Sequence, residues 1–255
     1  FLNKSFSIFH KFCSENNIIA SFIRFNPFAI NERIKKIDLE INYSRKIIFL
    51  NLKDDLKKIK NNYSSNQRNM IRKAKKKFIV KCNTKKNSFD NLVKIYLKNM
   101  KRIGADQFYF FDNYFFKNFY FNLKDNFIVL SAINKETNKV ASSILVLFDN
   151  KIGYYFFSGK EESLKENSSI NFLLHKSIIF LKRKKIKYFN LGGGNSDSEN
   201  DPLFKFKNRI SKDTKDFYIG KKIHDKLTYF KLTEMWCNKH PNSKNSNKFL
   251  KYRFS

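Results

Sequence analysis

Hydrophobic and polar residues recur along this chain with two different periods, and together they predict an order of helices and strands. Apolar residues at helical spacing predict helices at 5–16, 54–61, 64–77, 88–102, 112–121, 167–185 and 224–237. Alternating or short continuous apolar runs predict strands at 18–25, 37–43, 45–52, 78–82, 127–134, 140–148, 152–158, 188–191 and 217–220. We expect 37–43 and 45–52 to form a hairpin. Ser64 and Ser65 are both candidates for the cap of the helix that ends at Lys77, and Ser88 is the candidate for the next helix.

The order of elements after residue 88 predicts the fold class. Two helices are followed by three strands with short turns at 136–138 and 149–150, and hairpin turns make those strands antiparallel. The long helix 167–185 then crosses to 188–191, which we therefore expect to lie parallel to 152–158. This order resembles the GNAT acyltransferase fold, an α+β fold with a mixed, mainly antiparallel sheet flanked by helices. The resemblance implies that the two parallel strands splay apart and that the acyl donor enters the gap.

Five short segments, spread over nearly the whole chain, carry a closer resemblance. They are RFNP at 24–27 followed by Asn31, NQRNMIRKA at 66–74, FYF at 108–110, YFFSG at 155–159 and the stretch 192–207, which contains GGGN and DPLFKFK. In this order they resemble the FemABX-type branch of the GNAT superfamily, the aminoacyl- and acyltransferases of cell-wall bridge and surface-polysaccharide synthesis.

The resemblance implies a domain organisation and an activity. FemABX proteins have two GNAT-like halves, so we expect an incomplete N-terminal half at 1–86, an acyltransferase domain at 87–238 and a basic tail at 239–255. The chain starts with Phe1 rather than Met, which predicts that the beginning of a longer protein is missing. The implied activity is aminoacyl or N-acyl transfer to an amino group of a nucleotide- or lipid-linked cell-envelope precursor, such as a peptidoglycan or nucleotide-sugar intermediate. A basic nucleic-acid-binding protein and a catalytically inactive GNAT-like module are the alternatives.

The motif matches also imply site residues. Lys207 matches the family lysine that would stabilise the oxyanion or bind a donor phosphate, with Phe206 packed beside it, and its alternative is a solvated surface lysine. Arg68 and Arg72 lie one helical turn apart and would grip a diphosphate, unless they only form a solvated helix face. The other implied substrate-binding residues are Arg24, Asn26, Tyr109, Ser158, Gly193 and Gly194.

Asp201 precedes Pro202, and this order has two interpretations. The carboxylate would either accept the proton of the attacking amine or cap the segment that follows it, because Asp before Pro is common at helix starts. We favour the cap.

The stretch 159–169, GKEESLKENSS, bears on the acyl donor. GNAT enzymes that use acetyl-CoA have a glycine-rich turn here, whose amides cradle the pyrophosphate. This stretch has one glycine and three glutamates. It therefore argues against an ordinary CoA site and favours aminoacyl-tRNA as donor, with the tRNA acceptor end as a partner. A carrier-bound acyl group and acyl-CoA held in a different way are the alternative donors, and no further cofactor is assigned.

The net charge of +30 has two explanations that stay open. It attracts polyanions, including nucleic acid, nucleotide diphosphates and the surface of an anionic membrane. Equally, Lys, Asn, Ile, Phe and Tyr all have A- and T-rich codons, and the lysines are spread along the whole chain.

The three cysteines and four histidines have no metal-ligand spacing, so we expect reduced thiols, no metal, and a core position for His175. No apolar run is long enough to span a bilayer. These features predict a cytoplasmic protein, with peripheral contact at the inner face of the membrane.

Overall fold

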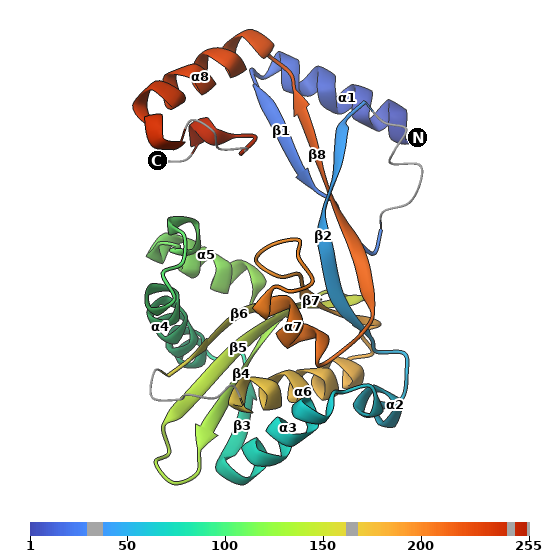
Figure 1. Cartoon of the computed structure of the whole chain (residues 1–255), viewed down its shortest axis with the longest axis vertical. Coiled ribbons are helices and arrows are strands. Elements are labelled where there is room, and N and C mark those ends of the chain that lie inside the picture. Colours follow the sequence, from blue (N-terminus) through green and yellow to red (C-terminus); the bar gives the residue numbers. More distant parts are fainter. Residues whose placement is uncertain (30–37, 162–167, 244–247, 254–255) are drawn as a thin grey trace. The chain divides into compact units, whose positions relative to one another are not determined.

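The computed structural model describes residues 1–29, 38–161, 168–243 and 248–253. Helices and strands follow one another along these residues (Figure 1). The helices are α1 Leu2–Glu15, α2 Leu56–Asn61, α3 Ser65–Lys77, α4 Lys86–Arg102, α5 Asn113–Leu123, α6 Ser168–Arg183, α7 Pro202–Asn208 and α8 Lys226–Lys239, with 3-10 turns η2 Gln107–Tyr109, η3 Pro241–Ser243 and η4 Lys251–Arg253. The strands are β1 Ala20–Arg24, β2 Glu40–Asn51, β3 Phe78–Asn83, β4 Phe127–Asn134, β5 Val140–Phe148, β6 Ile152–Lys160, β7 Tyr188–Gly192 and β8 Thr214–Ile223.

The strands are hydrogen-bonded in the order β1-β8-β2-β7-β6-β5-β4-β3. The pairs β3–β4, β4–β5, β5–β6, β2–β7 and β1–β8 are antiparallel, and β6–β7 is parallel. The predicted mixed, mainly antiparallel sheet is confirmed, as is the parallel return of β7 after the long helix.

By compactness the chain divides into two units, residues 1–46 with 215–255, and residues 47–214. These boundaries differ from those predicted at 86 and 238, and the assignment of two GNAT-like halves stays a prediction. In the first unit the described part of the basic tail packs on α8. The ring of Tyr229 lies 5.5 Å from that of Phe249, and its hydroxyl donates to the Phe249 carbonyl.

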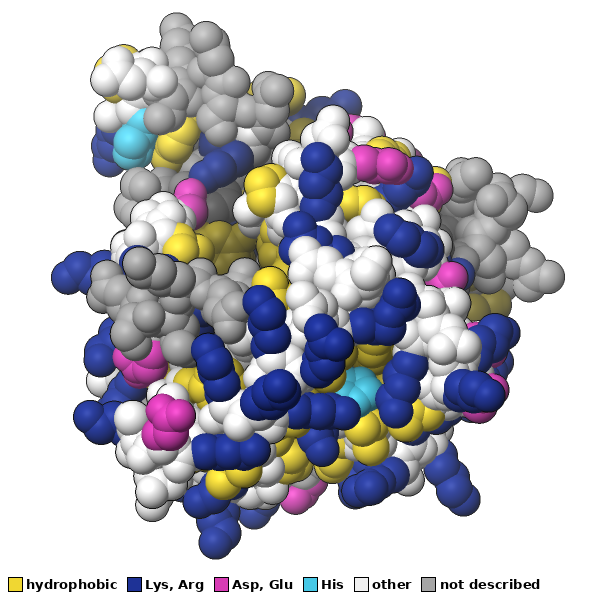
Figure 2. Space-filling model, turned by 60° about the horizontal axis from the view of Figure 1, so that its bottom comes forward, with side chains coloured by type: hydrophobic (Ala, Val, Ile, Leu, Met, Phe, Trp, Pro, Cys, Tyr) yellow, Lys and Arg dark blue, Asp and Glu magenta, His cyan; other side chains and the backbone are white. Residues whose placement is uncertain are grey.

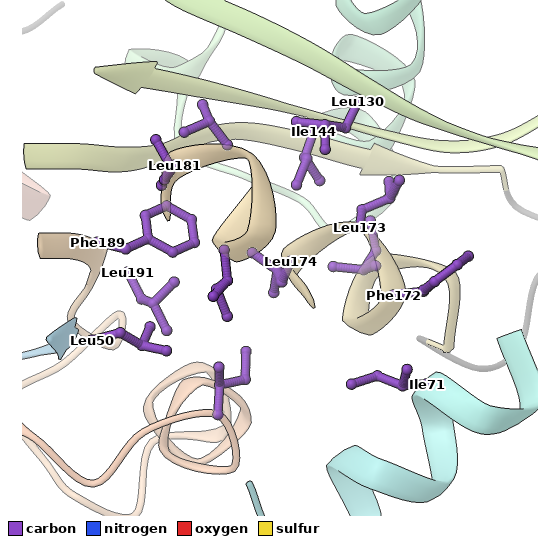
Figure 3. Packing of buried hydrophobic residues seen from close by; sticks show 14 of the residues in the cluster. Leu50, Ile71, Leu130, Ile144, Phe172, Leu173, Leu174, Leu181, Phe189 and Leu191 are labelled. Atoms are coloured by element: carbon purple, nitrogen blue, oxygen red, sulfur yellow. The ribbon is translucent and has the colours of Figure 1, made fainter. Parts of the chain in front are cut away.

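The second unit has a hydrophobic core on each face of its sheet. Ile128 and Leu130 of β4 point into the core formed with α2, α3, α6 and α7, whereas Phe127 and Val129 point into an aromatic-rich core with α4 and α5. Because side chains of a strand alternate between faces, a strand covered on both faces must be apolar throughout. Figure 3 shows the first core, where Leu173 and other residues of α6 pack between the sheet and α3.

The predicted hairpin at 37–43 and 45–52 is wrong. Residues 40–51 form the single strand β2, whose second half pairs with β7 from Ile48 to Asn51. Only Ser44 separates the two predicted strands, and one residue without a glycine cannot supply a hairpin turn. Ile37, like Asn31 of the first resemblance segment, lies outside the described residues. Of the two predicted cap candidates, Ser64 caps α3 by accepting from the Gln67 amide, and Ser65 is the first residue of the helix. The next helix starts two residues before Ser88, so Ser88 is not its cap.

His175 is a core residue, as predicted. It is 4% exposed, and its Nδ1 lies 3.2 Å from the Tyr63 hydroxyl. Burial, with smaller effects of Lys60, Lys75 and Lys176, lowers the pKa of His175 to about 4. The imidazole is therefore neutral in the folded protein at neutral pH.

This lowered pKa predicts a loss of stability in mild acid. In the unfolded chain His175 binds a proton below about pH 6.5, whereas in the folded chain it stays neutral down to about pH 4. The contribution of His175 to the unfolding free energy is therefore complete above about pH 6.5 and decreases as the pH falls toward about 4. Between pH 7.5 and 5 we expect the wild type to lose about 2 kcal/mol more unfolding free energy than His175→Gln. Urea unfolding of both proteins at the two pH values measures this difference, and parallel losses would show that His175 is not held neutral.

Candidate active site

The parallel strands β6 and β7 stop pairing before either strand ends, and we call the place where they separate the opening. The strands pair only from Ile152 opposite Tyr188 to Tyr154 opposite Asn190, whereas β6 stays paired with β5 as far as Lys160. The splay implied by the GNAT resemblance is therefore present, and it begins after Tyr154.

A β-bulge accompanies this separation. Leu145 of β5 pairs with Phe157, and the next residue, Val146, pairs with Tyr155, so Phe156 is an extra residue in β6. An extra residue twists a strand and changes which face its side chains point to. Tyr155 consequently packs against the core with α6 and α7, although Phe157, two residues on, belongs to the core with α4 and α5.

The short helix α7 positions Lys207 at the end of β7. Asp201 caps the helix, accepting from the amides of Leu203 (2.8 Å) and Phe204 (3.0 Å), and Pro202 occupies its first turn. The interpretation of Asp201 as a helix cap is confirmed.

Both carboxylate oxygens of Asp201 are occupied by backbone amides. The second oxygen accepts from the amides of Asn195 (3.0 Å) and Ser196 (3.1 Å), which ties the loop after β7 to α7. Burial raises the pKa of this carboxyl, but the four amide bonds together outweigh it and lower the pKa below its ordinary value. A low pKa and full occupancy make Asp201 a poor acceptor for an amine proton.

Lys207 lies in the last turn of α7 and reaches the glycine turn. The residue is 7% exposed, and its Nζ donates to the Gly193 carbonyl at 2.6 Å. Gly192 has a φ of +76°, and a Cβ there would lie 3.3 Å from Lys207 Nζ. The backbone at Gly194 is as tight, because a Cβ there would lie 2.6 Å from Asp201 Oδ1. The glycines thus let the backbone of the turn close around the ammonium group and the cap.

This arrangement contradicts the alternative that Lys207 is a solvated surface lysine. A buried ammonium group must be paired or hydrogen-bonded, since burying an isolated charge is costly. Held at a strand end beside an opening, it can stabilise negative charge that develops on a bound group. Phe206 packs against the same core as Phe204 and Leu191, which helps to fix α7.

Tyr155 is a candidate residue that the sequence reasoning passed over. Burial raises the pKa of Tyr155 to about 12, and a hydrogen bond with Ser158 acts in the opposite direction. The hydroxyl therefore keeps its proton at neutral pH and can donate a hydrogen bond. The residue stood in the YFFSG segment, but only the bulge turns it toward α6 and α7. Ser158, predicted from the same segment, is its partner.

The remaining predicted residues of this unit lie on other elements. Tyr109 is 47% exposed in η2, where its carbonyl accepts from Tyr96 at 2.9 Å, and the Tyr96 ring lies 4.7 Å from that of Phe157 on β6. Arg68 and Arg72 border a hollow of about 580 Å³ on α3.

Both arginines also contact the protein itself. The Arg68 guanidinium donates to the carbonyl of Tyr63, and that of Arg72 to Asn69 Oδ1 at 3.0 Å. In the first unit the guanidinium of Arg24 lies over the Phe217 ring at 5.4 Å, and Asn26 accepts from the Phe28 amide at 2.9 Å. Arg24 and Asn26 thus have local structural contacts, and their substrate-binding role stays a prediction.

Gly159, the one glycine of the predicted donor segment, is explained by packing. A Cβ there would lie 2.9 Å from the backbone of Ile95, so α4 approaches β6 too closely for any side chain. Residues 162–167, with Glu162 and Glu166, lie outside the described residues. A second hollow of about 580 Å³, between α4 and the β4–β5 turn, contains none of the predicted site residues.

The described residues contain no group of three or more His, Cys, Asp or Glu side chains placed to bind a metal ion. None of the described helices is both long enough and apolar enough to cross a membrane.

No protein-family model and no curated protein matches this chain. Among solved structures, FemX superposes with a TM-score of 0.61 at 11% identity, covering 74% of this chain and 64% of FemX. The chain has a FemX-like fold. The C-terminal domain of a protein assigned as a lysylphosphatidylglycerol synthetase in Agrobacterium fabrum matches with a TM-score of 0.56 at 13% identity, over 79% of this chain and 67% of that domain. L-PGS from Bacillus licheniformis matches with a TM-score of 0.53 at 10% identity, over 74% and 62% of the two chains.

The FemX-like fold is thus shared by proteins that differ almost completely in sequence. This chain spans less than two thirds of the FemX and L-PGS chains. At these identities the likeness concerns the fold, which by itself does not determine the reaction.

Proposed function

We propose that this protein is an acyltransferase that moves an aminoacyl or other acyl group to an amino group of a nucleotide- or lipid-linked cell-envelope precursor. The observation that carries the proposal is the buried ammonium group of Lys207 at the glycine turn, beside the opening between β6 and β7. The FemX-like fold supports it, because the opening lies at the place where the resemblance puts the donor.

The proposed reaction needs little more than positioning and charge stabilisation. The amine nitrogen attacks the carbonyl carbon of the donor ester, a C–N bond forms, and the oxygen of that carbonyl becomes negative. Lys207 stabilises this oxyanion or a donor phosphate. When the ester C–O bond breaks, the hydroxyl group of the donor leaves with the proton that the amine gives up. Tyr155 directly follows the last residue of β6 that pairs with β7, and its neutral phenol offers a second hydrogen-bond donor.

Aminoacyl-tRNA is the donor that we propose, in place of acetyl-CoA. The segment 159–169 has a single glycine, which serves the packing of α4, and three glutamates that would repel a pyrophosphate. The protein would act in the cytoplasm, on precursors at the inner face of the membrane.

The donor proposal predicts weak or undetectable binding of acetyl-CoA. Calorimetric titration at physiological salt measures it, with a charged tRNA titrated in parallel. Micromolar affinity for acetyl-CoA would return the protein to the acetyltransferases.

The function itself is tested by supplying both substrates. The protein is incubated with charged tRNA and an amine-bearing nucleotide-linked precursor, and the precursor is examined by mass spectrometry. We expect the precursor to gain the mass of one aminoacyl residue. If charged tRNA and acyl-CoA both fail with nucleotide-linked and lipid-linked acceptors, the inactive-module alternative is favoured.

A further inference from the structure

We infer that the surface formed by α2, α3 and α6 binds the phosphate backbone of RNA. This basic face consists of Lys60, Arg68, Arg72, Lys73, Lys75, Lys76 and Lys176. The inference deepens the proposed function, on which its link to a tRNA donor rests. RNA binding itself can be measured without any transfer reaction.

The first observation is a separation of charge along the chain. Residues 56–89 and 168–196 together contain 18 Lys and Arg and no Asp or Glu. The average composition, 22 acids in 255 residues, would put about five acids in these 63 positions. A codon bias toward lysine explains many cations, but it does not explain why acids are missing from these two segments.

The second observation is that folding brings these two segments together. α3 and α6 pack against each other through one core, which includes Ile71, Ala74 and Leu174. Lysines of α2, α3 and α6 lie close enough to His175 to lower its pKa. Figure 2 shows lysine and arginine side chains crowded over the face that carries these helices. Cations held this close repel one another, and an anionic ligand relieves the repulsion.

The third observation distinguishes RNA from a membrane surface. The exposed side chains of α3 are Ser65, Asn66, Arg68, Asn69, Arg72, Lys73, Lys75, Lys76 and Lys77, with no exposed apolar residue. A helix that lies on a membrane buries an apolar face in it, and the apolar stripe of α3 is already used in the protein core. Arginine, lysine and asparagine are the side chains that contact phosphates and sugars. Both arginines of α3 and its two asparagines, Asn66 and Asn69, border the hollow on this helix.

The basic face also lies next to the candidate active site. The amide of Ser64, the cap of α3, donates to the Arg209 carbonyl at 2.9 Å, two residues beyond Lys207. An RNA lying along α3 would therefore run toward the end of α7. A donor carried on the end of an RNA requires such closeness between the RNA-binding face and the site of transfer.

Two matched triple variants test the inference. The first, Lys73→Gln, Lys75→Gln and Lys76→Gln, removes three of the seven cations of the basic face and leaves Arg68 in place because of its contact with Tyr63. The control, Lys94→Gln, Lys98→Gln and Lys101→Gln, removes the same charge from exposed positions of α4. Binding of a structured RNA hairpin is measured from 50 to 300 mM salt.

We expect the first variant to weaken RNA binding at least about tenfold at low salt and to reduce the slope of log affinity against log salt by about 2–3, whereas the control keeps the wild-type slope. Equal losses in both variants would show a diffuse charge effect and overturn the inference. So would unchanged RNA binding with lost binding to phosphatidylglycerol vesicles, since the face would then serve a membrane. If RNA binds through this face but no acyl group is transferred, only the proposed function is refuted. If acyl transfer occurs but the first variant binds RNA with the same affinity and salt slope as the control, only the inference is refuted.

Discussion

Replacing Lys207 by alanine is expected to slow acyl transfer by about 10²- to 10³-fold, the loss typical of removing one oxyanion donor. The Gly193 carbonyl fixes the ammonium group at the end of β7, so another lysine elsewhere on the surface cannot take its place. Single-turnover rates with charged tRNA measure the effect. RNA affinity should change little, because one cation among many is lost.

Lys205→Ala is the matched control for this experiment. Lys205 lies on the same short helix but is exposed, so its removal tests for a general loss of positive charge near the site. We expect it to retain near wild-type transfer. Full transfer activity in folded Lys207→Ala, or an equal loss in Lys205→Ala, would show that the assigned role is wrong.

Replacing Gly159 by alanine is expected to lower the unfolding free energy by about 2–4 kcal/mol, because a new methyl group would meet main chain that cannot rotate away. The clash is with the backbone of Ile95, at 2.9 Å. Either α4 or β6 must shift, and the aromatic core between them would be disturbed. Urea unfolding of wild type and variant measures the loss.

Gly153→Ala on the same strand is the control. The three atoms nearest to a Cβ at Gly153 all belong to the side chain of Leu181 and none to the backbone, so a shift of that side chain can relieve the clash and we expect a smaller loss, about 1–2 kcal/mol. If Gly159→Ala were as stable as wild type and lost affinity for a donor, Gly159 would have a role in ligand binding. The packing explanation would then be wrong.

The sequence predicts the second unit well wherever local signals agree with burial. β4 and β5 were found because both faces of these strands are covered, which requires continuous apolar runs, and β7 because a long helix demands a parallel return. The cap at Asp201 followed from the order of aspartate and proline. The same stretch carried the resemblance that led to Lys207.

The features that were missed depend on contacts between distant residues. β2 reads as two strands because Ser44 interrupts the apolar pattern, and only its pairing partners show that it continues. The bulge at Phe156 has no local signature, because it is defined by the register of β6 against β5. Tyr155 could not be recognised as a site residue without that bulge. Which lysines are exposed depends likewise on the packing of α3 against α6, two helices far apart in the sequence.

We propose that the acyl group is transferred at the opening between β6 and β7, beside Lys207. The most direct test is mass spectrometry of an amine-bearing cell-envelope precursor after incubation with charged tRNA and either wild-type protein or Lys207→Ala. We expect the precursor to gain one aminoacyl residue with the wild type and almost none with the variant. The same yield and rate from both proteins would contradict the proposal.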